Sequence, residues 1–260
     1  MKRITPIIFA VLIIASSCKS QYQLVLEGSN VEAKYAMAMQ LFGEGKYSRA
    51  APLFESLSLV SAGTERDDTV QYYWGLSNYR QKDFSTAGAN FDTFISHYPN
   101  SPFTETAKYY RIDCLYRDTY RWSLDQTPTY GAITSINQYL IEKPDSAHAE
   151  RCKEMLADLE ERLDKKAYEA AKLYYNVEDY KASGVAFRNI LKDDASNIYR
   201  EDILYYTAMS SYKYALLSVA AKQKERYMQF QDDYLNFISE YPESKYRKEL
   251  DTLFKKLKTE

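Results

Sequence analysis

The sequence predicts an all-helical protein made of five tandem helix pairs, followed by a closing helix at the C-terminus. Glycine and proline, which interrupt helices, account for only 8 and 7 of the 260 residues. Few stretches alternate apolar and polar residues as a half-buried strand does. A short phrase also recurs along the chain, as "FISHYPNS" (94–101), "YLIEKPDS" (139–146) and "FISEYPES" (237–244). Together these features indicate a helical repeat protein.

Each recurring phrase is an apolar helix end followed by proline, a polar residue and serine. Pro99, Pro144 and Pro242 end one helix, because proline has no backbone N–H to continue it. The serine after each proline is suited to cap the next helix. The phrases therefore mark the boundaries between helix pairs.

Counting back from Pro99, the residues Gly75, Ala87 and Phe91 stand at the spacing of the tetratricopeptide repeat. The small Gly75 allows two antiparallel helices to approach, Ala87 faces it, and Phe91 fills the seam one turn later. The other units keep parts of this pattern: Ala38, Ala50 and Phe54 in the first; Ala132, Ile136 and Pro144 in the third; Ala171, Ser183 and Phe187 in the fourth; Ser218, Tyr234, Ile238 and Pro242 in the fifth. The third unit fits with Cys114 as its small residue if 121–129 holds extra loop residues, and the fifth has Phe230 in place of alanine.

An aromatic residue precedes the alanine of the second helix, or its equivalent, by three positions in four units: Tyr47, Phe84, Tyr180 and Tyr227. The predicted helix pairs are 32–60, 66–98, 102–143, 146–194 and 198–241, and 243–258 is the closing helix. The fold class is therefore an all-α tetratricopeptide-repeat superhelical solenoid, whose last helix is polar on its outer face.

The N-terminus has the pattern of a secretory signal peptide. Two basic residues precede a short apolar run, 7–15, and small residues lead to Cys18. The run is too short for a permanent transmembrane helix, which needs roughly 20 apolar residues. Ala15–Ser17 resemble a lipobox, with Ala15 where leucine is usual. We expect a signal peptide at 1–17, acylation of Cys18, and a linker to residue 31. The alternative is an ordinary cleaved signal followed by an unrelated cysteine.

Composition and motifs exclude several classes of function. The net charge of −2 and the lack of a basic block argue against a nucleic-acid-binding protein. His97 and His148 have no metal-ligand partner at helical spacing, and no phosphate-binding loop or nucleophile elbow occurs. Cys114 and Cys152 are either two buried thiols or a disulfide. We predict no enzyme, no metal and no cofactor.

A superhelix of helix pairs has a concave face, usually formed by the first helix of each pair, that binds peptides or partner helices. The candidate groove residues are Tyr72, Tyr73, Asn78, Tyr79, Arg80, Tyr109, Tyr110, Arg111, Tyr116 and Arg117. About half of the tyrosines are expected to pack between repeats instead. Arg80, Arg111 and Arg117 are the candidate partners for an anion.

The stretch "TPTYGAITSINQYLIEKPDSAHAERCKEMLADLEERLDKKAYEAAKLYY" (127–175) resembles the BamD family of outer-membrane assembly lipoproteins. It shares that family's Tyr/Ala-rich opening, its proline–acidic–serine turn and a long helix ending in paired tyrosines. The chain departs from the family at "DDASN" (193–197), where a Tyr-Pro turn is expected.

The resemblance implies a lipid-anchored protein on the periplasmic face of the outer membrane. Repeats 1–3 (32–143) would receive unfolded barrel proteins through their C-terminal signal, and repeats 4–5 with the closing helix (144–260) would bind the BamA-type β-barrel insertase. Other subunits of the assembly complex are possible partners. The alternative is a periplasmic tetratricopeptide-repeat adaptor lipoprotein of the cell-envelope, peptidoglycan or division machinery. A glycan lyase on a helical solenoid would need a catalytic carboxylate in a cleft, and the sequence indicates none.

Overall fold

The computed structural model describes residues 20–259, which form twelve helices and no strand. The predicted all-α class and the five helix pairs with a closing helix are confirmed over these residues. The predicted signal peptide (1–17) and Cys18 lie outside the described residues. Part of the predicted linker is helical, because α2 (Gln21–Glu27) begins there. In the described part of the chain, every helix is too short or too polar to cross a membrane.

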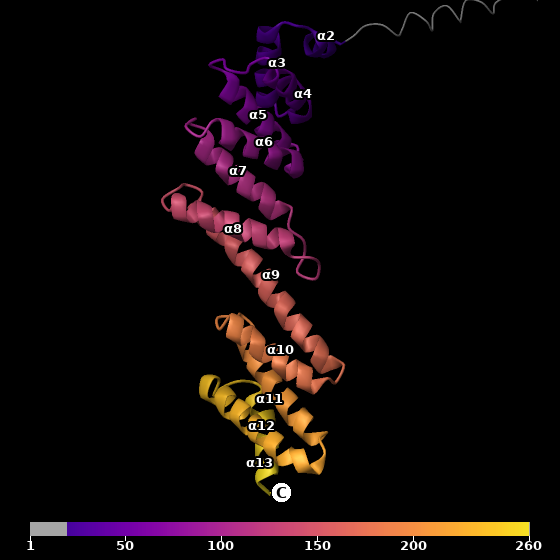
Figure 1. Ribbon diagram of the computed structural model, residues 1–260. Helices are drawn as coiled ribbons and strands as arrows, with labels where there is room; N and C mark the ends of the chain where they lie inside the picture. Colours follow the sequence, from indigo (N-terminus) through magenta and orange to yellow (C-terminus); the bar gives the residue numbers. More distant parts are fainter. Residues whose placement is uncertain (1–19, 260) are drawn as a thin grey trace, which may run out of the picture. The chain divides into compact units, whose positions relative to one another are not determined.

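The chain divides into two compact units. Unit 1 comprises residues up to Thr119 together with Tyr130–Ala149, and unit 2 comprises Tyr120–Thr129 together with the residues from Glu150 on. Unit 1 contains the first helices of the chain, drawn from indigo to magenta in Figure 1: α2, α3 (Val31–Gly43), α4 (Tyr47–Ser58), α5 (Asp67–Arg80), α6 (Phe84–His97), α7 (Thr104–Arg117) and most of α8 (Thr127–Glu142). Unit 2 contains the later helices: α9 (Ala149–Asn176), α10 (Tyr180–Asp193), α11 (Arg200–Leu216), α12 (Ala220–Glu240) and α13 (Arg247–Thr259).

Three turns within helix pairs share one backbone design. Gly45, Lys82 and Glu178 adopt positive φ values of 73°, 69° and 64° just after the first helix ends. The next residue donates its N–H five residues back, as Asp83 does to the Asn78 carbonyl at 3.0 Å. This bond is the closing bond of a Schellman motif. An aromatic residue (Tyr47, Phe84 or Tyr180) then begins the second helix, in agreement with the predicted repeat pattern.

The predicted serines lie at the junctions between helix pairs. Ser101, Ser146 and Ser244 each accept a hydrogen bond from the backbone N–H two residues later, at 3.3, 3.2 and 3.0 Å. This local bond shapes the turn that leads into the next first helix. After α10, where the proline is missing, Asn197 accepts the equivalent bond from Tyr199 at 3.0 Å.

The core of unit 1 is built where paired helices approach closely. Gly75 of α5 is buried against α6, and a Cβ there would lie 3.1 Å from the Phe91 ring and 3.3 Å from Asn90. Ala38, Ala50 and Ala87 are fully buried, as their signature positions predict. Cys114 is also buried, and it packs beside Gly88 of α6, where an added Cβ would lie 3.6 Å from the Cys114 Cβ.

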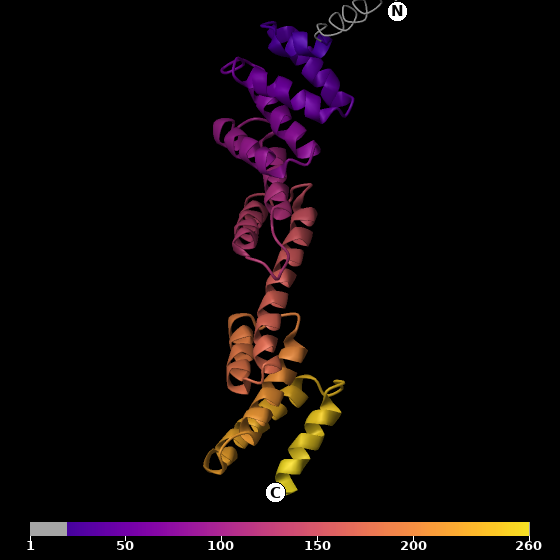
Figure 2. The ribbon, with the colours of Figure 1, turned by 90° about the vertical axis from the view of Figure 1, so that its right-hand side faces the viewer.

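Unit 2 has its own core, formed largely by α11 and α12. The fully buried side chains Phe230, Phe237 and Leu250 pack there with residues of α11. The closing helix α13, yellow in Figure 2, contributes Leu250, Leu253 and Phe254 to this cluster. The segment 121–129, expected to hold extra loop residues, is loop up to the start of α8 at Thr127. This loop lies against α9, where the Lys165 Nζ is 5.2 Å from the centre of the Trp122 ring.

The fifth helix pair departs from the predicted register. Ser218, predicted as the small residue at the helix crossing, lies in the turn between α11 and α12. The helix α12 begins at Ala220, seven residues before Tyr227, whereas α4, α6 and α10 begin at the aromatic residue itself. The predicted crossing at Ser218 is therefore wrong, because the second helix is longer at its start.

The close approach at Gly75 generates a stability prediction. We expect Gly75→Ala to lower the free energy of unfolding by about 1 kcal/mol. Overpacking costs about 1–3 kcal/mol, and removing a helix-interior glycine regains up to about 1 kcal/mol. Gly131→Ala in α8 is the matched control, because a Cβ there meets no atom within 4 Å. It should raise stability by about 0.5–1 kcal/mol. Urea unfolding followed by circular dichroism measures both, and equal gains at the two sites would contradict this packing.

Candidate functional site

The predicted groove tyrosines lie mainly in contacts between helices. Tyr72 is buried and stacks on Phe103, with ring centroids 4.5 Å apart. Tyr73 contacts the Phe42 and Phe54 rings of the first pair. Tyr110 stacks on Phe91 at 5.6 Å. The expectation that part of this set packs between repeats therefore agrees with the geometry.

The polar groove residues form a second layer of contacts. Asn78 is buried, and its Nδ2 donates to the Asn90 Oδ1 at 2.7 Å. The Tyr79 hydroxyl donates to the buried Asp113 carboxylate at 2.6 Å, and the Arg117 Nε donates to the same oxygen. Burial raises the pKa of Tyr79 well above its usual value, and the hydrogen bond to Asp113 adds to the effect. Tyr79 therefore stays a neutral donor to Asp113 at neutral pH.

The remaining predicted residues differ in how accessible they are. Tyr109 stacks on His148 with ring centroids 4.0 Å apart, and Tyr116 is half-buried. The Arg117 guanidinium also lies over the Phe84 ring, 4.9 Å from its centre. Arg80 is exposed and makes no hydrogen bond or ion pair with residues 20–259. Among the three arginines predicted to bind an anion, Arg80 has the most available guanidinium.

Arg111 lines a cleft of about 360 Å³ between α6, α7 and α8. Its Nε donates to Asp92 at 2.6 Å, and its Nη1 donates to the Ser135 hydroxyl at 2.9 Å. Lys108 in the same cleft pairs with Glu142 at 2.7 Å. The positive charges of this cleft are thus already matched by carboxylates of the chain itself.

The two cysteines are buried thiols, Cys114 in unit 1 and Cys152 in unit 2. Burial raises the pKa of the Cys114 thiol to about 12. A thiol with so high a pKa carries almost no reactive thiolate at neutral pH. Cys114 is therefore a packing residue.

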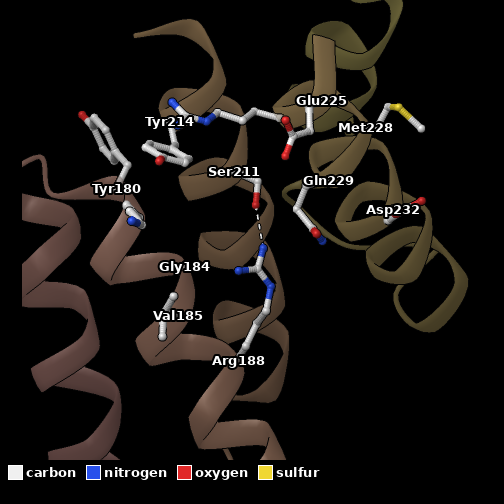
Figure 3. A pocket seen from close by; sticks show the side chains of 12 residues that line it. Tyr180, Gly184, Val185, Arg188, Ser211, Tyr214, Glu225, Met228, Gln229 and Asp232 are labelled. Atoms are coloured by element: carbon white, nitrogen blue, oxygen red, sulfur yellow. Dashed lines mark hydrogen bonds between the residues drawn. The ribbon is translucent and has the colours of Figure 1, made fainter. Parts of the chain in front are cut away.

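A second cleft, of about 520 Å³, lies in unit 2 and was not predicted from the sequence (Figure 3). One wall comes from α10, the floor from α11 and the other wall from α12. Its lining residues are Tyr180, Lys181, Gly184, Val185, Arg188, Ser211, Tyr214, Glu225, Arg226, Met228, Gln229 and Asp232. Of these residues the repeat pattern identified only Tyr180, as the aromatic residue three positions before the small residue of the second helix.

Arg188 bridges the floor and the far wall of this cleft. Its Nη2 donates to the Ser211 hydroxyl at 2.8 Å (Figure 3). The same nitrogen donates to the Asp233 carboxylate at 2.7 Å. Gly184 leaves room for the guanidinium, because a Cβ there would lie 3.3 Å from Nη1. At the end of the cleft near the α11–α12 turn, Arg226 lies over the Tyr214 ring, 4.0 Å from its centre. Three cations, Lys181, Arg188 and Arg226, and two carboxylates, Glu225 and Asp232, therefore line a partly apolar space.

The residues that line the two clefts are groups suited to binding. Within residues 20–259, no three histidine, cysteine or acidic side chains are placed to hold a metal ion. The His97 Nδ1 donates to the Thr93 carbonyl, 2.8 Å away within its own helix. The clefts offer cations, rings and exposed apolar side chains, which are groups that recognise peptides.

Comparison with known proteins adds a family. The YfiO family model, described as an outer membrane lipoprotein, matches residues 28–228. The outer membrane protein assembly factor BamD of Caulobacter vibrioides is 24% identical over 147 residues. That match spans 55% of this chain and 48% of the relative, about half of its length.

Comparison with solved structures gives weaker similarities. MamA from Desulfovibrio magneticus RS-1 has 12% identity and a TM-score of 0.38, covering 84% of this chain and 99% of that protein. A tetratricopeptide repeat protein from Parabacteroides merdae has 14% identity and a TM-score of 0.36, covering 88% of this chain and 75% of that protein.

The buried Asp113 generates a second prediction. Asp113→Ala should lower the free energy of unfolding by about 1–3 kcal/mol, because it leaves the Tyr79 hydroxyl without its acceptor. Asp92→Ala is the control. It removes the carboxylate that pairs with Arg111, and the Asp92 side chain is 57% exposed. An exposed pair contributes only about 0–1 kcal/mol. Urea unfolding of both variants tests the difference, and a loss at Asp92 as large as at Asp113 would refute it.

Proposed function

Because this chain belongs to the YfiO family of outer membrane lipoproteins, we propose that it is a lipid-anchored, non-enzymatic scaffold that assists the assembly of β-barrel proteins. The family match over residues 28–228, which reaches into both units, carries the proposal. The similarity to an outer membrane protein assembly factor supports it. The clefts in both units, with their cations and apolar walls, are consistent with a protein that binds other proteins.

The anchor we propose is an acylated Cys18 that holds the protein on the periplasmic face of the outer membrane. Ser20, only two residues later, is the N-cap of α2, and its hydroxyl accepts from the Gln23 N–H at 3.3 Å. Two residues of chain reach at most about 7 Å. The helix α2 is itself fixed to the first helix pair, because the Tyr22 hydroxyl donates to the Arg49 carbonyl at 3.0 Å. A lipid on Cys18 would therefore keep the first helix pair close to the membrane.

Each half of the chain has a proposed partner. Residues 32–143 would receive unfolded barrel proteins by their C-terminal signal, an aromatic residue with a free carboxylate. Residues 144–260 would bind the barrel insertase, and accessory subunits would complete the assembly. Exposed Arg80 at the end of α5 supports the first assignment, because arginine bonds both oxygens of a carboxylate.

Affinity purification of the lipidated full-length protein from membranes tests the scaffold. We expect a β-barrel insertase among the proteins cross-linked to it. Intact-mass measurement should show a diacyl or triacyl adduct on Cys18, and Cys18→Ala should lose stable membrane association when partners are absent. Recovery of peptidoglycan-synthesis or division proteins without a barrel protein would favour the adaptor alternative and contradict the proposal.

A labelled C-terminal barrel peptide tests the client assignment. We expect micromolar binding, about −8 kcal/mol, since an unfolded client loses conformational entropy when it docks. Arg80→Ala, and more strongly Arg80→Ala/Arg111→Ala, should weaken binding while the melting temperature stays unchanged. Lys46→Ala is the matched control, because it removes an exposed cation elsewhere in unit 1. Equal binding by all variants, or by a peptide without its terminal aromatic residue, would contradict the assignment.

A further inference from the structure

The turn between α4 and α5 exposes two large apolar side chains in succession. Leu59 is 81% exposed and Val60 is 57% exposed. Val60 lines a cleft of about 290 Å³ together with Val31, which begins α3 and is 41% exposed. Large apolar side chains that gather on an exposed surface are typical of a binding surface.

The other junctions between helix pairs are polar at the same position. Val60 stands six residues after Phe54, which fills the seam of the first pair. Counted in the same way from the counterparts of Phe54 in the later pairs, the equivalent residues are His97, Glu142, Asp193 and Glu240. Packing between repeats therefore does not require an apolar residue here. The apolar turn belongs to the first pair and needs an explanation there.

The backbone of this turn already has its hydrogen-bond partners. The Val60 and Ser61 N–H groups both donate to the Leu57 carbonyl at 2.9 Å. The Gly63 N–H donates to the Asp67 carboxylate at 2.9 Å, and the Ser61 hydroxyl donates to the same group at 3.1 Å. Asp67 is only 6% exposed, so the group that holds the turn is itself shielded. Backbone groups need such internal partners wherever they leave water for lipid.

The proposed anchor determines which apolar surface lies within reach of the turn. Cys18 is two residues from Ser20, and Val31 follows Ser20 by eleven residues, seven of which form α2. This connection spans at most about 25 Å. Val25 and Leu26 of α2 pack against the core of the first pair, so α2 cannot swing away from it freely. With Cys18 acylated, the bilayer is therefore the apolar surface nearest to the turn.

The charges around the turn do not favour anionic headgroups. Glu32 lines the same cleft and pairs with Arg66 at 2.7 Å. Glu65 is exposed and also lines it. Two carboxylates and one guanidinium leave a net negative charge beside the apolar residues. A contact with lipid here must come from burial of Leu59 and Val60 and not from attraction to anionic lipids.

We propose that the α4–α5 turn inserts Leu59 and Val60 into the surface of the periplasmic leaflet, as a second membrane contact beside the acyl chains. The inference rests on the acylation of Cys18 put forward under the proposed function. Two apolar side chains bind a bilayer weakly by themselves. The anchor makes this second contact intramolecular, which raises its effective concentration to about the millimolar range. Two points of contact hold the first helix pair in one orientation on the membrane.

The test places one fluorophore at two equivalent positions. Ile141 is the counterpart of Leu59 in the third pair and is 77% exposed. Acylated full-length Leu59→Cys and Ile141→Cys are labelled with nitrobenzoxadiazole and placed in phosphatidylethanolamine–phosphatidylglycerol vesicles. Cys114 and Cys152 are buried, so the label goes to the new thiol. Lipids with a nitroxide near the top of the acyl chain should quench about half of the emission at position 59, because interfacial apolar groups lie roughly 5–10 Å deep. Emission at position 141 should change little.

A charge placed beside the label separates insertion from mere proximity. Val60→Asp, added to the Leu59→Cys protein, should abolish the quenching, and Val60→Leu should preserve it. Phosphatidylcholine in place of phosphatidylglycerol should leave the quenching unchanged, because the contact is apolar.

Three outcomes would overturn the proposal: equal quenching at both positions, quenching that survives Val60→Asp, or no quenching at position 59 unless other outer-membrane proteins are present. The last of these would assign the turn to a protein partner. Intact mass measured on the same sample distinguishes this failure from that of the anchor. An acylated protein whose label at position 59 stays unquenched contradicts only the second membrane contact.

Discussion

A side-chain oxygen at the junction between successive helix pairs fixes how one pair follows another. Ser101 accepts the Phe103 N–H, and its own hydroxyl donates to Asp68 at the start of α5, 2.8 Å away. Ser146 does the same one pair later, accepting from His148 and donating to Glu105 of α7 at 2.9 Å. One hydroxyl thus shapes the turn into the next pair and ties it to the first helix of its own pair. Because proline stops the preceding helix at a set position, Ser101 and Ser146 meet equivalent neighbours. After Pro242, Ser244 accepts the Tyr246 N–H in the same way, and the Tyr246 hydroxyl bonds Asp202 of α11.

Once the pairs are placed, aromatic rings fill the spaces between them. Phe91 lies under Gly75 within one pair, and Tyr110 of the next pair stacks on the same ring. In unit 2, Phe187 and Tyr206 form a similar stack, with ring centroids 5.6 Å apart. A tyrosine suits such positions because its ring packs while its hydroxyl reaches a partner. This accounts for much of the unusual count of 26 tyrosines, and it leaves fewer of them for binding.

The sequence predicted the helix pairs because proline, serine and the small residues act locally. It also predicted that the loop 121–129 interrupts the third pair. It could not predict the fifth pair, where α12 starts seven residues early and moves Ser218 into the turn. Nor could it show that "DDASN" forms an equivalent junction, in which Asp194 accepts from the Ser196 N–H at 2.9 Å and Asn197 replaces the serine. Candidate groove residues are harder still, because the same tyrosine pattern serves packing and binding, and only the fold shows that Tyr72 and Asn78 are buried.

The two units use the same three groups, an arginine, a carboxylate and a serine hydroxyl, in their clefts. Arg111 bonds Asp92 through Nε and Ser135 through Nη1, so most of its guanidinium donors are already in use. Arg188 reaches Asp233 and Ser211 with a single nitrogen, because these two groups lie next to each other and Ser211 donates to Asp233. The same kind of bridge therefore leaves the arginine of unit 2 with donors to spare. One nitrogen of the Arg188 guanidinium holds the side chain in place, while its other nitrogens stay free of hydrogen bonds to residues 20–259. Such a side chain loses little further conformational entropy on binding, which favours recognition of a carboxylate. The cleft of unit 2 therefore keeps more free guanidinium donors than the cleft of unit 1, and Glu225 and Asp232 line it as well.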